Sequence, residues 1–181
     1  MHDEFVVINY NVHSFLQFDE RLERLLSELG TRRWDLLVLI ETWRKERCEE
    51  WCTSHGHRWF GSGGFRGHSG VGFLLHNRWR HARFKPCSDR AATLDLVLPL
   101  QKKICFIAVF FPHGGLPEDQ VEALFATVEA ECTEARNRKY KLVIAGDFNA
   151  EVGSRNDLDD ASVIGNCSLT TRSKRGDMSL Q

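Results

Sequence analysis

The sequence predicts an α/β fold that forms one domain across residues 1–181. Short apolar runs typical of buried strands alternate with two segments whose apolar residues recur at helical spacing. Hydrophobic residues make up 42% of the chain and charged residues 27%, which is sufficient apolar material to build a core. The length of 181 residues is typical of a single domain.

Strands are expected wherever β-branched and aromatic residues form a short apolar run. The first covers residues 5–12, and the second, 35–43, is almost continuously apolar, as is usual for a strand buried on both faces. The stretch 142–150 begins with a similar run and then continues as Gly-Asp-Phe-Asn. Further strands are expected at residues 59–60, 71–75, 93–98 and 104–111.

Two amphipathic helices are expected to cover the sheets. Across residues 18–30 leucines recur every three or four positions, and Gly30 provides a natural end for the helix. A second helix follows Pro117, a residue that suits a first helical turn, and its apolar face consists of Val121, Leu124, Phe125, Val128 and Cys132. A short helix is also expected near residues 46–55.

The end of the 142–150 stretch carries the strongest functional signal. Asp147 and Asn149 follow the apolar run, and alternate residues of an extended chain point to the same side. A carboxylate and a carboxamide are therefore expected to face one pocket. The structural alternative is an Asx turn, because Asp and Asn favour turns by bonding their own backbone.

Two earlier strands end in a similar way. Asn9 and Asn11 share one face of the first strand, and Glu41 closes the second. If the three strands lie side by side, Asn11, Glu41, Asp147 and Asn149 meet at one edge of a sandwich. Carboxylate oxygens suit Mg²⁺ or Mn²⁺, and the asparagines would orient a phosphate or an attacking water.

Five motifs, taken in order, resemble those of the endonuclease/exonuclease/phosphatase superfamily. The resemblance is strongest to the apurinic-endonuclease-like endonuclease domains of non-LTR retrotransposons and their domesticated relatives. It spans nearly the whole chain, and it implies a four-layered α/β sandwich of two mixed sheets with helices outside. The motifs are Asn-x-Asn-Val at 9–12, Glu-Thr-Trp at 41–43, Gly-Val-Gly-Phe-Leu-Leu at 70–75, Val-Phe-Phe-Pro-His at 109–113 and Gly-Asp-Phe-Asn at 146–149.

The resemblance also implies an activity, which is Mg²⁺-dependent cleavage of phosphodiesters with DNA as the substrate. Glu41 matches the main metal ligand. Asp147 matches the residue that positions or deprotonates the attacking water, and it is a second candidate metal ligand. Asn11 and Asn149 match residues that hold this water and the scissile phosphate.

Two positions and the C-terminal end of the sequence depart from the family pattern. Phe110 stands where relatives usually carry a tyrosine, whose hydroxyl would contact phosphate, and His13 stands where some relatives have Asp or Asn. Relatives end in a Ser-Asp-His type motif, whereas no histidine follows His113 here. We therefore expect a C-terminally truncated member that lacks the last strands, and we expect its activity to be weakened or lost.

The charge balance gives no general attraction for DNA. The chain has 24 basic and 25 acidic residues, so DNA must be bound by a local patch if it is bound at all. The alternative for each basic cluster is a solvated charged face. The candidate basic residues are Arg78, Arg80, Arg83, Lys85, Arg172, Lys174 and Arg175, the last of which is the candidate phosphate contact near the terminus.

No signal sequence and no apolar run long enough to span a bilayer is visible. We expect an intracellular protein, nuclear or cytoplasmic, that does not contact membranes. The six cysteines are scattered, so we expect free thiols and no disulfide-linked partner. The spacing of Cys48, Cys52, His55 and His57 matches no standard zinc site.

Three hypotheses of function follow. The first is a metal-dependent DNA endonuclease, and the second is an inactive relic that retains metal or nucleic-acid binding. The third is a phosphatase or phospholipase built on the same core, because fold does not determine substrate. The Thr-Trp pair at 42–43 and the 109–113 motif favour the first hypothesis over the third.

Overall fold

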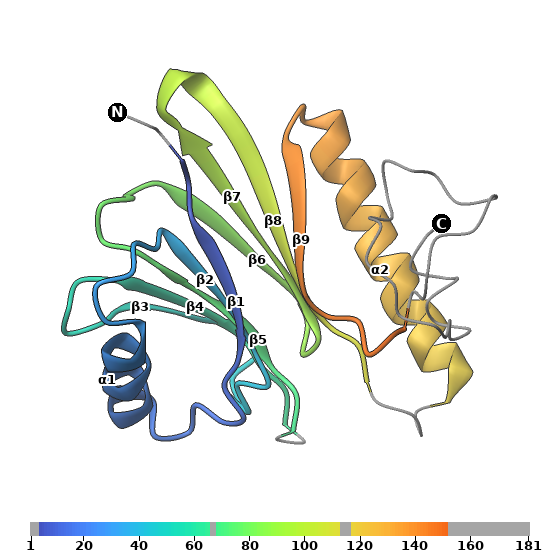
Figure 1. Cartoon of the computed structure of the whole chain (residues 1–181). Helices are drawn as coiled ribbons and strands as arrows, with labels where there is room; N and C mark the ends of the chain where they lie inside the picture. The colour runs from blue at the N-terminus through green and yellow to red at the C-terminus, as the bar shows by residue number, and fades with distance from the viewer. Residues whose placement is uncertain (1–3, 66–67, 113–116, 152–181) are drawn as a thin grey trace.

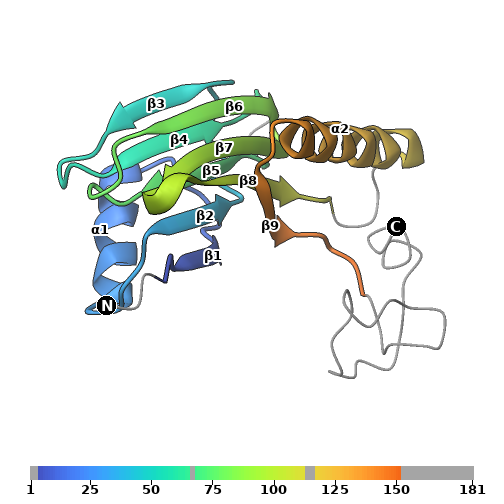
Figure 2. The ribbon, with the colours of Figure 1, turned by 90° about the horizontal axis from the view of Figure 1, so that it is seen from above.

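The apolar runs of the sequence pair into two sheets that pack face to face, with one helix on each outer side. The computed structural model describes residues 4–65, 68–112 and 117–151. Figure 1 shows the four layers in succession: α1, a first sheet, a second sheet and α2. The same layers are seen from above in Figure 2, where α1 and α2 lie on opposite sides of the two sheets.

The first sheet has five strands in the order β1-β2-β5-β4-β3, with β1 and β2 parallel and the other neighbours antiparallel. All residues of β2 and β5 are buried, which explains why their sequences are continuously apolar. The strands are β1 (Val7–Asn11), β2 (Leu36–Ile40), β3 (Glu49–Cys52), β4 (Arg58–Ser62) and β5 (Val71–Leu75).

The second sheet has four strands in the order β6-β7-β8-β9. Its first three strands are antiparallel, and β9 is parallel to β8. Both sheets are therefore mixed, and the expected four-layered sandwich is confirmed. The strands are β6 (Ala82–Ser88), β7 (Ala91–Leu98), β8 (Lys102–Phe110) and β9 (Lys141–Asp147), with a short 3₁₀ helix, η1 (Pro99–Gln101), between β7 and β8.

The two expected helices form, and each buries one face. Helix α1 (Phe18–Leu29) ends at Gly30, whose φ of 55° is left-handed and whose N–H bonds the carbonyls of Leu26 and Ser27. Helix α2 (Glu118–Asn137) begins directly after Pro117. No helix in the described part of the chain is long and apolar enough to cross a membrane.

Three apolar clusters hold the layers together. The largest lies between the sheets and includes Phe73, Leu94 and Phe106, each at most 1% exposed. A second packs α1 on the first sheet, and a third packs α2 on the second sheet. The central strands of each sheet are thus covered on both faces, whereas β1 and β9 remain partly exposed.

The helix expected near residues 46–55 is wrong, because this segment contains strand β3. Trp51 pairs in register with Trp59 of β4. The Glu49 side chain is buried and accepts hydrogen bonds from the Arg44 guanidinium at 2.6 Å and from Trp59 Nε1 at 3.0 Å. Pairing with the sheet therefore overrides the local helical pattern.

Strand β6 was not expected, since its residues appeared only as a basic cluster. It is an edge strand that contains Pro86, and its register with β7 shifts between Pro86 and Ser88. Proline is tolerated at sheet edges and bulges because it cannot donate to the ladder. Because of the proline and the register shift, the sequence of β6 lacks the regular apolar pattern by which a strand is recognised.

Candidate active site

The carboxyl ends of β1 and β2 bring Asn11 and Glu41 together. The two strands are parallel, and Asn11 pairs in register with Ile40, the residue before Glu41. Asn11 Nδ2 donates a hydrogen bond of 2.6 Å to Glu41 Oε1. The proximity expected from the two strand ends is therefore present, and the carboxylate is held by a neutral donor.

His13 completes this group. Its backbone N–H donates to Asn11 Oδ1 at 3.0 Å, and its Nδ1 lies 3.4 Å from Glu41 Oε2. The His13 side chain is 73% exposed and that of Glu41 is 14% exposed. Glu41 thus has one face against protein groups and one oxygen near a solvent-exposed imidazole.

The backbone of this edge departs from the usual conformations. His13, Glu41, Trp43 and Asn149 have φ angles of 46°, 54°, 55° and 45°. For residues with a Cβ, left-handed backbone costs on the order of 1 kcal/mol each. Such strain is concentrated at functional sites in many proteins.

The second half of the site lies at the end of β9. Asp147 Oδ1 accepts the backbone N–H of Asn149 at 2.8 Å, which is the Asx turn considered as the structural alternative. Asn149 leaves the strand, and its Nδ2 donates to the Phe111 carbonyl at 2.5 Å. The two side chains are therefore held by the turn, not by strand alternation.

Gly146 permits this arrangement. A Cβ at this position would lie 1.8 Å from the Val109 carbonyl oxygen, so no other residue fits without displacing the strand. Its φ of 150° lies at the limit of the region that side chains rarely adopt. The glycine lets β9 approach β8 closely at the point where Asp147 emerges.

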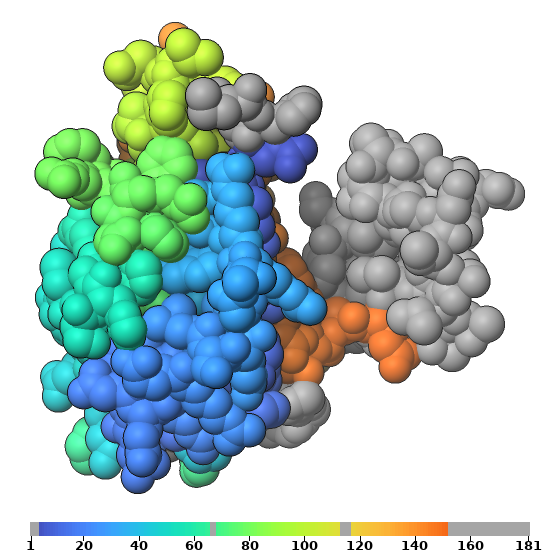
Figure 3. Space-filling model, turned by 60° about the vertical axis from the view of Figure 1, so that its left-hand side comes forward, coloured from blue at the N-terminus to red at the C-terminus, as the bar shows by residue number. Residues whose placement is uncertain are grey.

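The two halves belong to different sheets, so β9 packs against β1 and β2 across the sandwich and does not pair with them in one sheet as the sequence suggested. They are joined by a hydrogen bond of 3.1 Å from Asn9 Nδ2 on β1 to the Gly146 carbonyl on β9. Figure 1 shows β1 and β9 ending at the same side of the sandwich, and Figure 3 shows the segment after β9 (orange) emerging beside the N-terminal elements (blue).

The oxygen donors fit a largely hydrated divalent ion. Within the described residues, no three His, Cys, Asp or Glu side chains are grouped as a metal cage. Mg²⁺ does not need one, because it commonly binds one or two carboxylates and keeps several waters. Glu41, held by Asn11, can supply one such carboxylate. The described residues Cys48, Cys52, His55 and His57 are not grouped as a metal site.

Most of the basic residues proposed to contact DNA either form ion pairs within the protein or lie outside the described residues. Arg78 Nε pairs with Asp35 Oδ1 at 3.0 Å, and Lys85 Nζ lies 2.8 Å from both Glu131 and Glu134. The hydrogen bond that Lys85 donates to Glu131 is the main reason that the pKa of Lys85 is raised. The expected contacts Arg172, Lys174 and Arg175 lie outside the described residues.

The cysteines of the described segments carry free thiols. Burial raises the pKa of Cys87 to about 12, which makes this thiol a poor nucleophile and a poor metal ligand. Burial also raises the pKa values of Cys105 and Cys132. None of the three is a candidate for the chemistry of the site.

A sequence model of the Endonuclease/Exonuclease/phosphatase family matches residues 8–172. This range contains every residue of the two half-sites. A search of curated proteins finds no match. The family match covers most of the chain.

Solved structures with the same fold include three nucleases. The endonuclease domain of TRAS1, a telomere-specific non-LTR retrotransposon, is 14% identical, with a TM-score of 0.57 over 97% of this chain and 67% of that one. A 3′-5′ exonuclease from Neisseria meningitidis is 21% identical, with a TM-score of 0.58 over 81% of this chain and 59% of that one. An AP endonuclease from Archaeoglobus fulgidus is 16% identical, with a TM-score of 0.57 over 86% of this chain and 60% of that one.

The present chain thus spans between 59% and 67% of the length of these structures. At such identities the likeness concerns the fold. The two sheets and both outer helices of the present chain are consistent with it.

Proposed function

Because the chain belongs to the endonuclease/exonuclease/phosphatase family, we propose that it is a divalent-metal-dependent phosphodiester hydrolase that acts on DNA. One observation carries the proposal. A carboxylate fixed by a carboxamide, Glu41 by Asn11, stands at the same end of the sandwich as the Asp147 turn, and Asn9 ties the two sheets together there. This geometry supports attack of water on a phosphate bound at this end of the sandwich, where the strand ends of the two sheets meet.

Glu41 is the proposed ligand of Mg²⁺ or Mn²⁺, with Asp147 as a second carboxylate facing the ion. A bound divalent ion would polarise a phosphoryl oxygen and neutralise developing charge. The role of Asn11 is positional, since its Nδ2 holds Glu41 Oε1 at 2.6 Å. Holding Oε1 leaves Oε2, which lies 3.4 Å from the exposed His13 Nδ1, as the oxygen that would bind the ion.

Asp147 is proposed to orient the attacking water and to accept its proton. General bases of this kind contribute roughly 10²- to 10⁴-fold to rate. The Asn149 N–H fixes Oδ1 of the Asp147 carboxylate at 2.8 Å, and the Asn149 side chain is fixed in turn by Phe111. The carboxylate therefore keeps its orientation without a cationic partner.

DNA is the proposed substrate for two reasons. The AP endonuclease and the retrotransposon endonuclease domain share this fold. A further structure of the fold, from Neisseria, is described as a 3′ phosphatase bound to a product DNA hairpin. A retrotransposon origin, in the sense of descent from such an endonuclease domain, is part of this proposal.

Metal-dependent nicking of supercoiled plasmid tests the proposal. The wild type is compared with Glu41→Gln and Asp147→Asn, and with Glu20→Gln as a control for loss of an exposed carboxylate on α1. We expect nicking by the wild type and the control with Mg²⁺ or Mn²⁺, and a loss of at least about 10²-fold in the two site variants. Equal nicking by all four proteins indicates a contaminating nuclease and contradicts the proposal.

The same proteins distinguish an enzyme from an inactive relative. Calorimetric titration with Mn²⁺ measures ion binding independently of hydrolysis. Binding that is weakened by Glu41→Gln, without nicking by the wild type, would support the relic hypothesis. If the wild type neither nicks plasmid nor binds Mn²⁺, the proposal of a metal-dependent hydrolase is refuted.

A further inference from the structure

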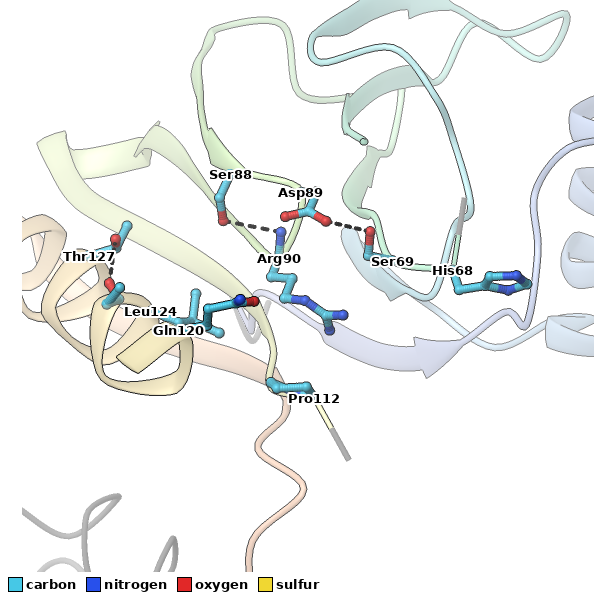
Figure 4. Close-up of a pocket in the computed structure, with 10 residues that line it drawn as sticks. His68, Ser69, Ser88, Asp89, Arg90, Pro112, Gln120, Leu124 and Thr127 are labelled. Carbon is cyan, nitrogen blue, oxygen red and sulfur yellow. Dashed lines mark hydrogen bonds between the residues drawn. The ribbon is translucent and has the colours of Figure 1, made fainter. Parts of the chain in front are cut away.

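A cavity lies beside the candidate active site, on the side of α2. Its volume is about 380 Å³, which is in the range of small-ligand sites. It opens to solvent and is lined by the segment before β5, the turn between β6 and β7, the end of β8 and the first turns of α2 (Figure 4). The lining residues used below are Ser69, Asp89, Arg90, Pro112 and Gln120.

Arg90 is the cation of this cavity. Its guanidinium stands over the Phe110 ring, 5.1 Å from the centroid, and its Nη1 donates to the Phe110 carbonyl at 3.5 Å. Both partners are uncharged, and no carboxylate of the described segments forms an ion pair with it. Arg44 and Arg138, by contrast, are neutralised by Glu49 and Asp95. Arg90 is thus oriented by stacking while its charge stays available.

Two of the three hydroxyl groups around Arg90 donate their protons within the protein, and the third accepts a hydrogen bond. Ser69 Oγ donates to Asp89 Oδ2 at 2.6 Å, and Thr127 Oγ1 donates to the Ala123 carbonyl at 2.8 Å. Ser88 Oγ accepts the Arg90 backbone N–H at 3.1 Å. A phosphate in this cavity could therefore be bound by the Arg90 guanidinium and, beside it, by the Ser88 hydroxyl.

Asp89 is the acidic residue of the lining, and it is turned toward the neighbouring loop. Its Oδ2 is bonded to Ser69, and its backbone carbonyl accepts the Gly70 N–H at 2.7 Å. Figure 4 shows the Asp89 carboxylate directed at Ser69, while the Arg90 side chain extends between Ser69 and Pro112 and Gln120 reaches into the same space. The negative charge of Asp89 reduces the positive potential in the cavity, but its carboxylate is bonded to Ser69 and not to the Arg90 guanidinium.

The cavity shares a strand end with the active site. Phe110, on which Arg90 stacks, pairs in register with Asp147. The next residue, Phe111, donates its N–H to the Asp147 carbonyl at 2.7 Å and accepts the Asn149 side chain. A phosphate bound by Arg90 would therefore lie next to the Phe110–Phe111 segment, which also positions Asp147 and Asn149.

We propose that Arg90 binds a backbone phosphate of the substrate strand next to the phosphate that is cleaved. The inference rests on the proposed function, because it assumes a nucleic-acid strand at the Glu41–Asp147 edge. A guanidinium stacked on an aromatic ring recognises phosphate through its planar pair of donors and carries no information about base identity. Arg90 would thus contribute affinity and register but not sequence preference.

Fluorescence anisotropy of a labelled DNA duplex without added metal tests the contact without turnover. The variants are Arg90→Gln and Arg90→Lys. The matched control is Arg136→Gln, because Arg136 is exposed in the last turn of α2, at the opposite end of that helix from the cavity. Loss of one phosphate contact should reduce the slope of log K against log salt by about 0.9. The affinity advantage of the wild type over Arg90→Gln should shrink about 3.5-fold between about 50 and 200 mM salt.

Arg90→Lys separates charge from packing. It should keep the wild-type salt slope while binding more weakly, because the charge remains and the stacked fork is lost. A purely structural Arg90 predicts that Lys and Gln behave alike, with the slope unchanged in both. That result would overturn the inference, as would the same slope change in Arg136→Gln.

The two proposals fail differently. If the wild type nicks plasmid and binds the duplex, but Arg90→Gln binds with the same affinity and slope, only the Arg90 contact is refuted. If the wild type neither nicks nor binds DNA, the proposed function fails and the Arg90 contact fails with it. Thermal melting of each variant confirms that all were compared in the folded state.

Discussion

His57 is held among aromatic and imidazole rings at the end of β4 and β5 that lies farthest from Glu41. Its ring centroid is 4.9 Å from that of Trp34, 4.7 Å from that of His76 and 6.0 Å from that of His55. Its Nδ1 accepts the Asn77 backbone N–H at 3.1 Å. Burial, followed by the charges of His76 and His55, lowers the pKa of His57 from 6.5 to about 4.

This shift makes the free energy of unfolding depend on pH. The unfolded chain binds a proton at His57 near pH 6.5, whereas the folded chain resists it until about pH 4. Stability is therefore highest above the unfolded pKa and is lost as the pH falls through this window. One pKa unit corresponds to roughly 1.4 kcal/mol, so a fall from about pH 7 to pH 5 should remove about 2 kcal/mol. That is a large share of a typical domain stability of roughly 5–15 kcal/mol.

Urea unfolding at about pH 7 and pH 5 measures the effect. The informative variant is His57→Asn, because its side-chain oxygen can accept the Asn77 N–H and cannot be protonated in this range. His81→Asn, at an exposed histidine, is the control. We expect the wild type and the control to lose about 2 kcal/mol and His57→Asn to lose clearly less. Equal losses in all three proteins would refute the assignment to His57.

Three further predictions concern stability. Asp35→Asn removes a fully buried carboxylate that accepts Trp79 Nε1 at 2.8 Å, so we expect a loss of about 3 kcal/mol by chemical denaturation; a loss below about 1 kcal/mol would contradict it. Gly146→Ala forces a Cβ to 1.8 Å from the Val109 carbonyl, and it should lower both the melting temperature and nicking. Lys85→Met breaks a half-exposed pair network, so we expect at most about 1 kcal/mol, decreasing with added salt; a salt-independent loss would argue for packing instead.

The fold was predictable where a local pattern and the final packing agree. β2 and β5 are continuously apolar because both faces of their sheet are covered. Helix α1 was recognisable because its leucines recur with the helical period and Gly30 ends it. In these elements the burial required by the fold is visible in the sequence itself.

The fold was not predictable where distant contacts determine the structure. Nothing within residues 46–55 indicates that Glu49 is neutralised by Arg44 and bonded by Trp59, yet this network places β3 in the sheet. β6 is similarly defined by its pairing to β7 and not by an apolar pattern. Partners that lie far apart in sequence leave no periodic signal.

The site shows the same division. The closeness of Asn11 and Glu41 follows from parallel neighbouring strands, and the sequence suggested it. The placement of Asp147 in the other sheet did not follow, because the connection depends on the Asn9 bond across the two sheets. Arg90 also carried no signal in the sequence, since its availability results from what stands next to it in space.

The left-handed backbone at Glu41 and Trp43 has a consequence for descent. Their φ angles of 54° and 55° suit glycine or asparagine better than glutamate or tryptophan, at a cost of about 1 kcal/mol each. A lineage released from chemistry and selected only to fold would gain by replacing them. If the proposed chemistry is what maintains this strain, relatives that no longer need it are expected to replace these two residues early.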